Sequence, residues 1–279
     1  MVRMLDSEQD SATDPSDDRG LGGAESLVRR TLTRVLLPGL ILLGLWATIA
    51  FLSRSSLLDV LTDFYNLTVF GDSDGNLLHE HVAMSLFRVT LGFSAAVLTA
   101  IPLGIAIGRY SLVSSVLGPV IEAMRPIPPI AWIPLSLVMF RANLIGSQVF
   151  IIWIGAFFPI LIDTTTGVKR TKPVHIDVAK TFGASESQIL SKIVIPSAVP
   201  EIFSGLRIGF GIGWMCLVAA EMIAGSLGLG HLVWISQQTG NTGAVIAGMA
   251  LIGIVGFIVS YVFLLTERHL LKWRQDVRV

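Results

Sequence analysis

The sequence has little charge and almost no cysteine. Only 14% of its residues are Asp, Glu, Lys or Arg, whereas a soluble globular domain has about 25%. Its 52% hydrophobic residues exclude a disordered chain, which combines low hydrophobicity with high net charge. The single cysteine, Cys216, excludes an internal disulfide and a zinc site built on several cysteines. These deficits indicate an integral membrane protein with several helices.

Motifs for nucleotide and metal binding are also missing. No G-x-x-x-x-G-K-[ST] loop is present, so the chain lacks the usual cradle for nucleotide phosphates. His79-Glu80-His81 is the nearest approach to a metal-binding group, and nothing else completes a ligand set. No Ser-His-Asp set stands out at membrane depth. We therefore expect no metal, no cofactor and no enzyme, and any energy source must come from a partner or an ion gradient.

Uncharged stretches predict the membrane spans, because a helix of about 20 apolar residues crosses a bilayer. Residues 125–140 contain four prolines and should form a kinked span, which is tolerated where protein or a water-filled cavity satisfies the backbone. A short cytoplasmic helix over 111–124 should approach it. The fold class is all-α, with six transmembrane helices. The other five spans are expected at about 35–53, 89–108, 142–162, 203–224 and 244–266.

The placement of Lys and Arg predicts the orientation in a cell membrane. With both termini in the cytoplasm, the inner segments carry seventeen Lys or Arg residues and the outer loops carry two, as the positive-inside rule requires. Residues 1–34 are polar and acidic and should form a disordered cytosolic tail, before a transmembrane domain over 35–279. The first outer segment collects acidic residues, namely Asp59, Asp63, Asp72, Asp74 and Glu80.

The inner loop over about 168–202 carries the main signal. Pro173 suits the first turn of a helix and Gly183 suits the residue after its end. Ser185 and Gln188 form a capping box that opens a second helix. The pattern predicts two short helices joined by a glycine turn. Alternatively, the loop is a surface hairpin that merely connects two spans.

A spaced motif runs through this loop. It reads Asp177-Val178-Ala179, then Gly183, then Ile193-Val194-Ile195-Pro196. The motif resembles the E-A-A, three residues, G, nine residues, I-x-L-P pattern of the ABC importer permeases of bacteria and archaea. The spacing matches throughout, and the sequence departs at Asp177, Val178 and Ile195. Pro196 and Pro200 should stop the second helix and turn the chain back to the membrane.

The resemblance covers about residues 82–274 and points to the permeases for nitrate, sulfonate, taurine and bicarbonate. Residues 140–143 depart from the Trp-Phe-Gly-Ile common in that group. The segments that carry the resemblance are 85–93, 125–134, 155–159, 205–207, 220–222 and 228–230.

The resemblance implies a type I importer with particular partners. These are a second permease subunit, expected to be an identical copy, two cytosolic ATPase subunits, an external substrate-binding protein and membrane lipid, but no nucleic acid. The helix over 174–182 should seat in a cleft on the ATPase. The residues implied for this coupling loop are Asp177, Ala179, Gly183, Ile193 and Pro196.

Four residues are candidates for the translocation path or its gate: Pro128, Pro129, Trp132 and Glu221. Broken helices expose backbone groups at membrane depth, and an ionisable residue within a span is a functional suspect. Trp132 could instead be a packed core or interface aromatic. Glu221 could instead be a hydrated or paired carboxylate at the outer membrane boundary.

The expected substrate is a small anion such as nitrate, a sulfonate, taurine or bicarbonate. Thiamine-precursor pyrimidines and riboflavin are alternatives carried by related permeases. Two other classes remain as rivals. An ion-coupled secondary transporter should show paired midplane charges and repeated spans, and a membrane enzyme should show a catalytic set.

Overall fold

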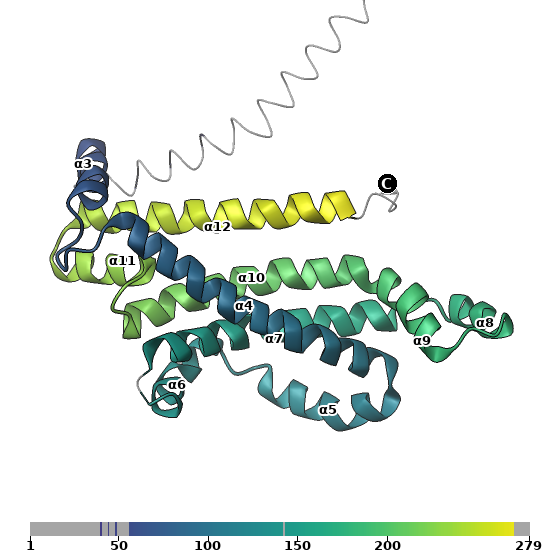
Figure 1. The fold of residues 1–279 in the computed structure, drawn as a ribbon. Helices are drawn as coiled ribbons and strands as arrows, with labels where there is room; N and C mark the ends of the chain where they lie inside the picture. The colour runs from purple at the N-terminus through teal and green to yellow at the C-terminus, as the bar shows by residue number, and fades with distance from the viewer. Residues whose placement is uncertain (1–39, 41–43, 45–47, 49–55, 142, 271–279) are drawn as a thin grey trace, which may run out of the picture. The chain divides into compact units, whose positions relative to one another are not determined.

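The structure is a computed structural model that describes residues 40, 44, 48, 56–141 and 143–270 (Figure 1). The chain divides into two units, Met1–Leu57 and Leu58–Val279, and the architecture below is that of the second. The predicted tail over 1–34 lies outside the described residues. So does the first predicted span over 35–53, apart from residues 40, 44 and 48.

The described part of the second unit is built from helices. Four of the described helices are long and apolar enough to cross a membrane: Leu78–Arg109, Leu144–Lys169, Glu186–Ala224 and Thr242–Glu267. Each overlaps one of the predicted spans, and the count of six stays a prediction. In chain order the elements are α3 (Leu57–Val69), α4 (Leu78–Arg109), α5 (Ser111–Met124), η2 (Pro129–Trp132), α6 (Ile133–Met139), α7 (Leu144–Lys169), α8 (Pro173–Thr181), α9 (Glu186–Ile189), η3 (Leu190–Val194), α10 (Ile195–Ala224), α11 (Leu229–Gln238) and α12 (Thr242–Leu270).

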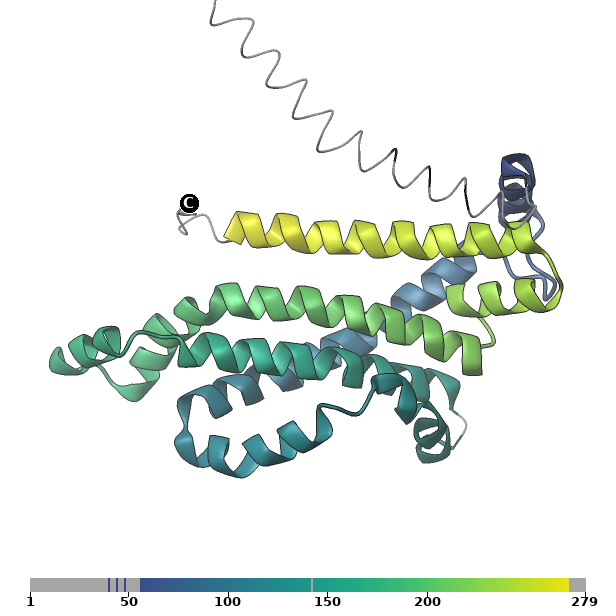
Figure 2. The ribbon, with the colours of Figure 1, turned by 180° about the vertical axis from the view of Figure 1, so that it is seen from behind.

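Helices α4, α7 and α10 form the central bundle and lie side by side in both views (Figures 1 and 2). Small residues recur every four positions on α4 and let it approach α7 closely. A Cβ atom added at Gly104 would lie 2.8 Å from Thr164 Cβ and 3.0 Å from the Leu161 carbonyl oxygen. Helices α4 and α7 therefore move little relative to one another without repacking. The small residues on this face of α4 are Gly92, Ala96, Ala100, Gly104 and Gly108.

The proline-rich region is a broken pair of helices. Helix α5 has the predicted bounds, 111–124, but it packs along the bundle: Val113, Leu117 and Ile121 contact the buried cluster of α4 and α7. The chain then turns, and helical structure resumes only at Pro129, in η2 and α6. Of the kinked span expected over 125–140, residues 129–139 are helical, in η2 and α6, and a break separates them from α5. That this segment spans the membrane stays a prediction. Three prolines at positions 126, 128 and 129 explain the break, because none can donate a backbone hydrogen bond.

One prediction about the inner loop is wrong. Pro196 and Pro200 were expected to stop the second helix, but α9, η3 and α10 form one continuous helical segment over Glu186–Ala224. Pro196 lies in the first turn of α10 and Pro200 within it. The preceding segment, η3, is a π-helix. Its wider turn replaces the ordinary i→i−4 hydrogen bonds directly before Pro196, which has no N–H to donate to such a bond.

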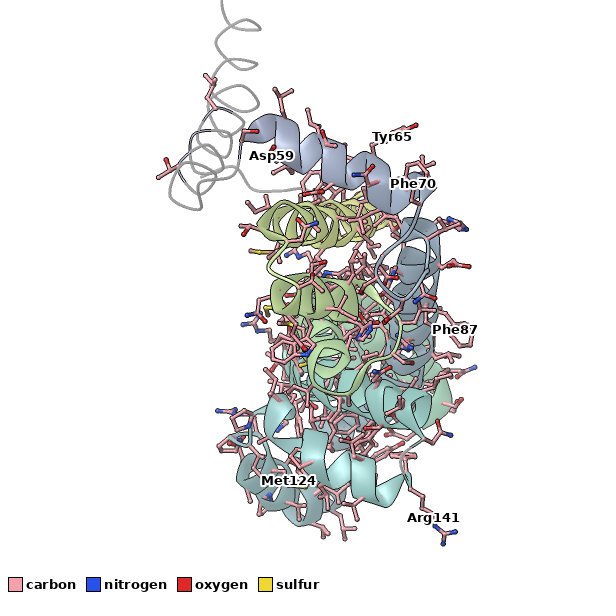
Figure 3. The ribbon with its side chains drawn as sticks, turned by 90° about the vertical axis from the view of Figure 1, so that its left-hand side faces the viewer. Asp59, Tyr65, Phe70, Phe87, Met124 and Arg141 are labelled. Carbon is pink, nitrogen blue, oxygen red and sulfur yellow. The ribbon has the colours of Figure 1, made fainter. Side chains whose placement is uncertain are left out.

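The second unit has two distinct ends (Figure 1). Helices α8 and α9 lie at one end, called here the loop end. Helix α11 and the start of α12 lie at the other, called here the α11 end. Large apolar side chains are exposed on its surface, and Figure 3 shows Tyr65, Phe70 and Phe87 pointing outward, with exposed fractions of 61%, 73% and 52%. Such a surface suits lipid, with aromatic residues near a membrane interface.

Candidate functional site

The loop end contains the predicted helix, glycine turn and second helix. Pro173 opens α8. Gly183 has a φ of 77°, and its N–H donates to the Lys180 carbonyl (2.9 Å) while the Ala184 N–H donates to the Ala179 carbonyl (3.0 Å). This pair of bonds is a Schellman cap, which requires a left-handed residue at the glycine position. The sequence prediction for this turn is confirmed.

The second helix begins with the predicted capping box. Ser185 Oγ accepts the Gln188 N–H at 3.3 Å, and Gln188 Oε1 accepts the Ser185 N–H at 2.9 Å. The loop is also joined to α4, because Arg109 donates to the Glu186 carboxylate. Both helices are therefore held in defined positions relative to the bundle.

Helix α8 presents an apolar stripe to solvent at this end. Val174, Val178 and Phe182 are 66%, 50% and 86% exposed, and their spacing of four residues places them on one face. Asp177 is exposed beside them. Ala179 faces the other way and packs against the loop's own cluster. An exposed apolar stripe at the tip of a molecule is typical of a partner-binding surface.

The remaining predicted residues of the loop lie in the segment that leads into α10. Ile193 is half-buried within η3, and Pro196 is exposed in the first turn of α10. Neighbouring Val194 is 1% exposed and belongs to the cluster that holds the loop on α7 and α10. These residues therefore fix the loop's exit from the bundle rather than its outer surface.

Near the α11 end a buried ion pair joins α4 to α10. Arg88 Nη1 donates to Glu221 Oε1 at 2.9 Å, and the two residues are 2% and 0% exposed. Ser85 Oγ, one turn before Arg88, donates to the same carboxylate at 2.8 Å. Glu221 is thus a buried, paired carboxylate rather than a hydrated one, and its assignment to the path or gate stays a prediction.

The turn between α10 and α11 wraps around this carboxylate. The Gly230 N–H donates to Glu221 Oε2 at 2.9 Å, and the Leu227 carbonyl accepts from Arg88 Nη1. Gly228 has a φ of 137°, a backbone region that is essentially restricted to glycine. A Cβ atom at Gly228 would lie 2.3 Å from the Glu221 carboxyl group, so glycine is required here for space as well.

A histidine extends the network to the segment before α4. His81 is fully buried, and its Nε2 lies 3.1 Å from Asp72 Oδ2. Its Nδ1 lies 2.9 Å from the Gly228 carbonyl oxygen and 3.1 Å from the Gly228 nitrogen, so the ring bridges Asp72 and the Gly228 backbone. Sequence reasoning treated His81 only as a poor metal ligand. We refer to His81, Ser85, Arg88 and Glu221 as the α11 anchor.

Sequence analysis missed the partner of Glu221. Arg88 directly precedes the span predicted over 89–108, and nothing in the local sequence indicates its pairing. Within the part of the chain that the structure describes, two buried polar atoms in or beside the anchor have no hydrogen-bond partner, Arg88 Nε and Gln148 Oε1. Gln148 Nε2 donates to the Ala224 carbonyl at 3.2 Å, so α7 also reaches the end of α10. The sequence offered one clue. Arg88 precedes one uncharged stretch and Glu221 follows another, and in the predicted orientation both positions lie on the outer side of the membrane.

The candidate path residues lie in the broken region. Pro128 is exposed before η2, and Pro129 opens it. Trp132 is half-buried and meets Phe150 edge to face, with ring centroids 6.4 Å apart. The three residues lie together, whereas Glu221 belongs to the separate anchor.

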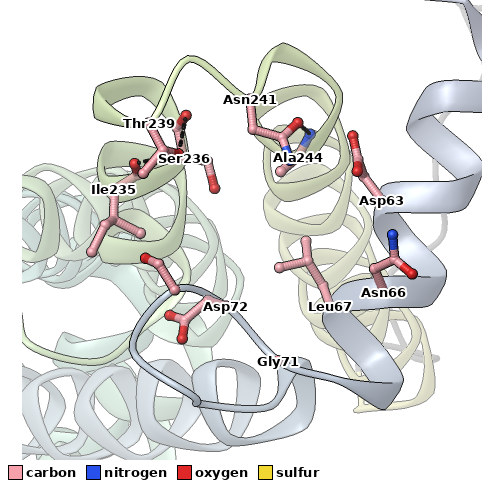
Figure 4. Close-up of a pocket in the computed structure, with 11 residues that line it drawn as sticks. Asp63, Asn66, Leu67, Gly71, Asp72, Ile235, Ser236, Thr239, Asn241 and Ala244 are labelled. Carbon is pink, nitrogen blue, oxygen red and sulfur yellow. Dashed lines mark hydrogen bonds between the residues drawn. The ribbon is translucent and has the colours of Figure 1, made fainter.

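A cavity of about 380 Å³ lies beside the anchor, between α3, α11 and the start of α12 (Figure 4). The carboxyl groups of Asp63 and Asp72 line it, together with Asn66, Ser236 and Asn241. Its acidic lining does not suit an anion. Among the described residues, no group of three or more His, Cys, Asp or Glu side chains could hold a metal ion.

Comparisons with known proteins agree with this architecture. A putative ABC transporter permease of Methanocaldococcus jannaschii is 44% identical over 73% of this chain and 76% of its own length. The taurine transport system permease of Escherichia coli is 41% identical over 72% and 73% of the two chains. The nitrate import permease of Leptolyngbya laminosa is 31% identical over 93% and 94%.

A solved structure shares the fold. An inward-facing methionine ABC transporter chain superimposes with a TM-score of 0.58 at 18% identity, over 69% of this chain and 95% of that chain. The profile of the family described as "binding-protein-dependent transport system inner membrane component" matches residues 100–273. The chain therefore belongs to the family of inner-membrane permease components of binding-protein-dependent ABC importers.

Proposed function

We propose that this protein forms the membrane path of an ATP-driven importer for a small anion, with the loop end in the cytosol and both termini there. The observation that carries the proposal is the capped loop at residues 173–189, with its exposed apolar stripe, in a chain of this permease family. Family membership supplies an ATPase and an external binding protein as partners. A second, identical copy completes the permease pair.

The apolar stripe of α8 is the contact with the ATPase. Phe182 and Val178 enter an apolar cleft on that subunit, while Asp177 stays at the rim of the contact. Gly183 and the capping box keep α8 at a fixed angle to α9. ATP-driven closure of two ATPase subunits then displaces α8 as a rigid element and carries α7 and α10 with it.

The solute passes between the two permease copies, along the broken region that contains Pro128, Pro129 and Trp132. Support comes from physical chemistry: backbone outside regular helices is tolerated at membrane depth only where protein or water satisfies it. A small anion is favoured because the relatives include permeases named for taurine, nitrate and bicarbonate. The external binding protein selects among such anions.

Mass spectrometry of small molecules retained by the cognate external binding protein tests the substrate class. We expect a small anion that displaces labelled taurine, nitrate or bicarbonate. A retained cation, or a large neutral solute such as riboflavin, would contradict the anion assignment and leave the permease assignment intact. Copurification of an ATPase subunit with the tagged chain tests the subunit role separately.

A further inference from the structure

Helix α11 has one buried and one exposed face. Leu232 and Val233 are 0% and 8% exposed, whereas Trp234 is 43% exposed and Gln237 and Gln238 face solvent. The helix lies at the end opposite α8 (Figure 1). In the proposed orientation this is the outer end, where a loaded binding protein arrives.

Side chains of other helices cap the start of α11. Gly228 occupies the N-cap position and has no side chain to offer, although the first N–H groups of any helix need external acceptors. The α11 anchor supplies them from α4 and α10. The pairs are Gly228 N–H with His81 Nδ1 (3.1 Å), Leu229 N–H with Ser85 Oγ (2.9 Å) and Gly230 N–H with Glu221 Oε2 (2.9 Å).

A buried ion pair is a poor means of adding stability, because desolvation offsets its attraction. Apolar side chains of similar size would hold α4 on α10 equally well. The Arg88–Glu221 pair does something that apolar packing does not: it fixes the direction of two backbone groups at the start of α11, the Leu227 carbonyl and the Gly230 N–H. Its geometry is specific for one orientation of α11 on the bundle.

The same bundle reaches the loop end. Helix α7 ends at Lys169 and α8 begins at Pro173, and the loop leads directly into α10. Helix α4 is locked on α7 by small residues such as Gly104. Helix α11 and the coupling loop are therefore attached to opposite ends of one closely packed three-helix body.

We propose that Ser85, Arg88 and Glu221 are positioning residues for import: they hold α11 in one orientation on the three-helix body, so that docking of the loaded binding protein at the outer end reaches the ATPase at the loop end. This proposal rests on the proposed function. It assigns a transport role to a network that touches neither the ATPase nor the solute.

The experiment uses the complete complex of permease and ATPase in nanodiscs, with basal hydrolysis of ATP and its stimulation by loaded binding protein measured separately. Ser85→Ala removes one hydroxyl that donates to Glu221 and accepts from Leu229. Glu221→Gln removes the charge and keeps the size. We expect both variants to assemble with unchanged basal hydrolysis, while stimulation falls toward the basal rate. Ser85→Thr, which keeps the hydroxyl, should retain stimulation.

The matched control is Thr164→Val, which removes an equally buried hydroxyl on α7 that has no hydrogen-bond partner among the described residues. It should leave both rates unchanged. If assembled Ser85→Ala and Glu221→Gln complexes keep wild-type stimulation, the anchor is merely structural and the proposal is overturned. A parallel fall of basal and stimulated rates would also overturn it. If even the wild-type chain binds no ATPase, the proposed function fails instead.

Discussion

Arg88 and Glu221 are separated by 133 residues in the sequence, yet Arg88 Nη1 lies 2.9 Å from Glu221 Oε1. The pair is buried between α4 and α10, and the turn into α11 closes over it. Removing one partner of such a pair leaves an uncompensated buried charge, at a cost of about 3–5 kcal/mol. Variants with a charge deleted must therefore be compared only after assembly has been verified.

The glycine of the coupling loop offers a test that depends on backbone conformation alone. Gly183→Val should weaken transport and ATPase docking, because a β-branched residue at a φ of 77° is strained by roughly 1–2 kcal/mol. A Cβ atom at this position meets nothing within 4 Å, so crowding does not contribute. Reconstituted transport and copurification of the ATPase measure the effect.

Gly183→Asn is the matched control, since asparagine tolerates the left-handed region. It should retain most of the transport that the valine variant loses. Equal activity of wild-type protein and Gly183→Val would show that the glycine turn is not needed for coupling.

Phe182 should be an anchor of the ATPase contact. Phe182→Asp removes the most exposed apolar side chain of the stripe. Burying a phenylalanine contributes about 1.5–3 kcal/mol, which corresponds to roughly ten- to hundredfold in affinity. Copurification of the ATPase with the variant should fall accordingly.

Ser187→Asp introduces the same charge at another exposed position of the loop and serves as the control. It should leave copurification unchanged. Loss in both variants would indicate a general effect of acidic charge, and loss in neither would place the ATPase contact elsewhere.

Close packing of α4 on α7 can be tested with one substitution at two places. Gly104→Ala places a Cβ atom 2.8 Å from Thr164 Cβ, and overpacking of this kind costs roughly 1–3 kcal/mol. Gly118→Ala, in α5, meets nothing within 4 Å. We expect a lower thermal unfolding midpoint for the first variant only. Equal unfolding midpoints would mean that α4 and α7 are not closely packed at Gly104.

Orientation in the membrane can be read from cysteine labelling. Cys216 is first replaced by serine, and single cysteines are placed at Ser73 and Ser187, which are both exposed. An impermeant thiol reagent should label position 73 from outside intact cells. It should label position 187 only after permeabilisation. The reverse pattern would place the coupling loop outside the cell and exclude its contact with a cytosolic ATPase.

Local rules predicted the loop well, because its structure is set by neighbouring residues. Pro173, Gly183, Ser185 and Gln188 each act within one or two turns, and all four lie as the sequence predicted. Pro196 misled the same reasoning. A proline normally breaks a helix, but a π-helical turn directly before it accommodates the missing donor.

Long-range pairings could not be derived in the same way. A paired carboxylate at the outer membrane boundary was one alternative for Glu221, but nothing local identifies Arg88 or Ser85 as its partners. Helix α5 illustrates a different limit. Its bounds, 111–124, are those that the sequence predicted, whereas its packing along α4 and α7 depends on the tertiary arrangement.

ATP-dependent uptake tests the central claim most directly. Vesicles that contain the permease and its ATPase are loaded with ATP, or with a non-hydrolysable ATP analogue, on the side of the ATPase. The binding protein and the labelled anion are added on the opposite side. We predict that the anion accumulates only when ATP is hydrolysed and the binding protein is present. Phe182→Asp should abolish this accumulation. Uptake by the chain alone, driven by an ion gradient without the ATPase, would contradict the account.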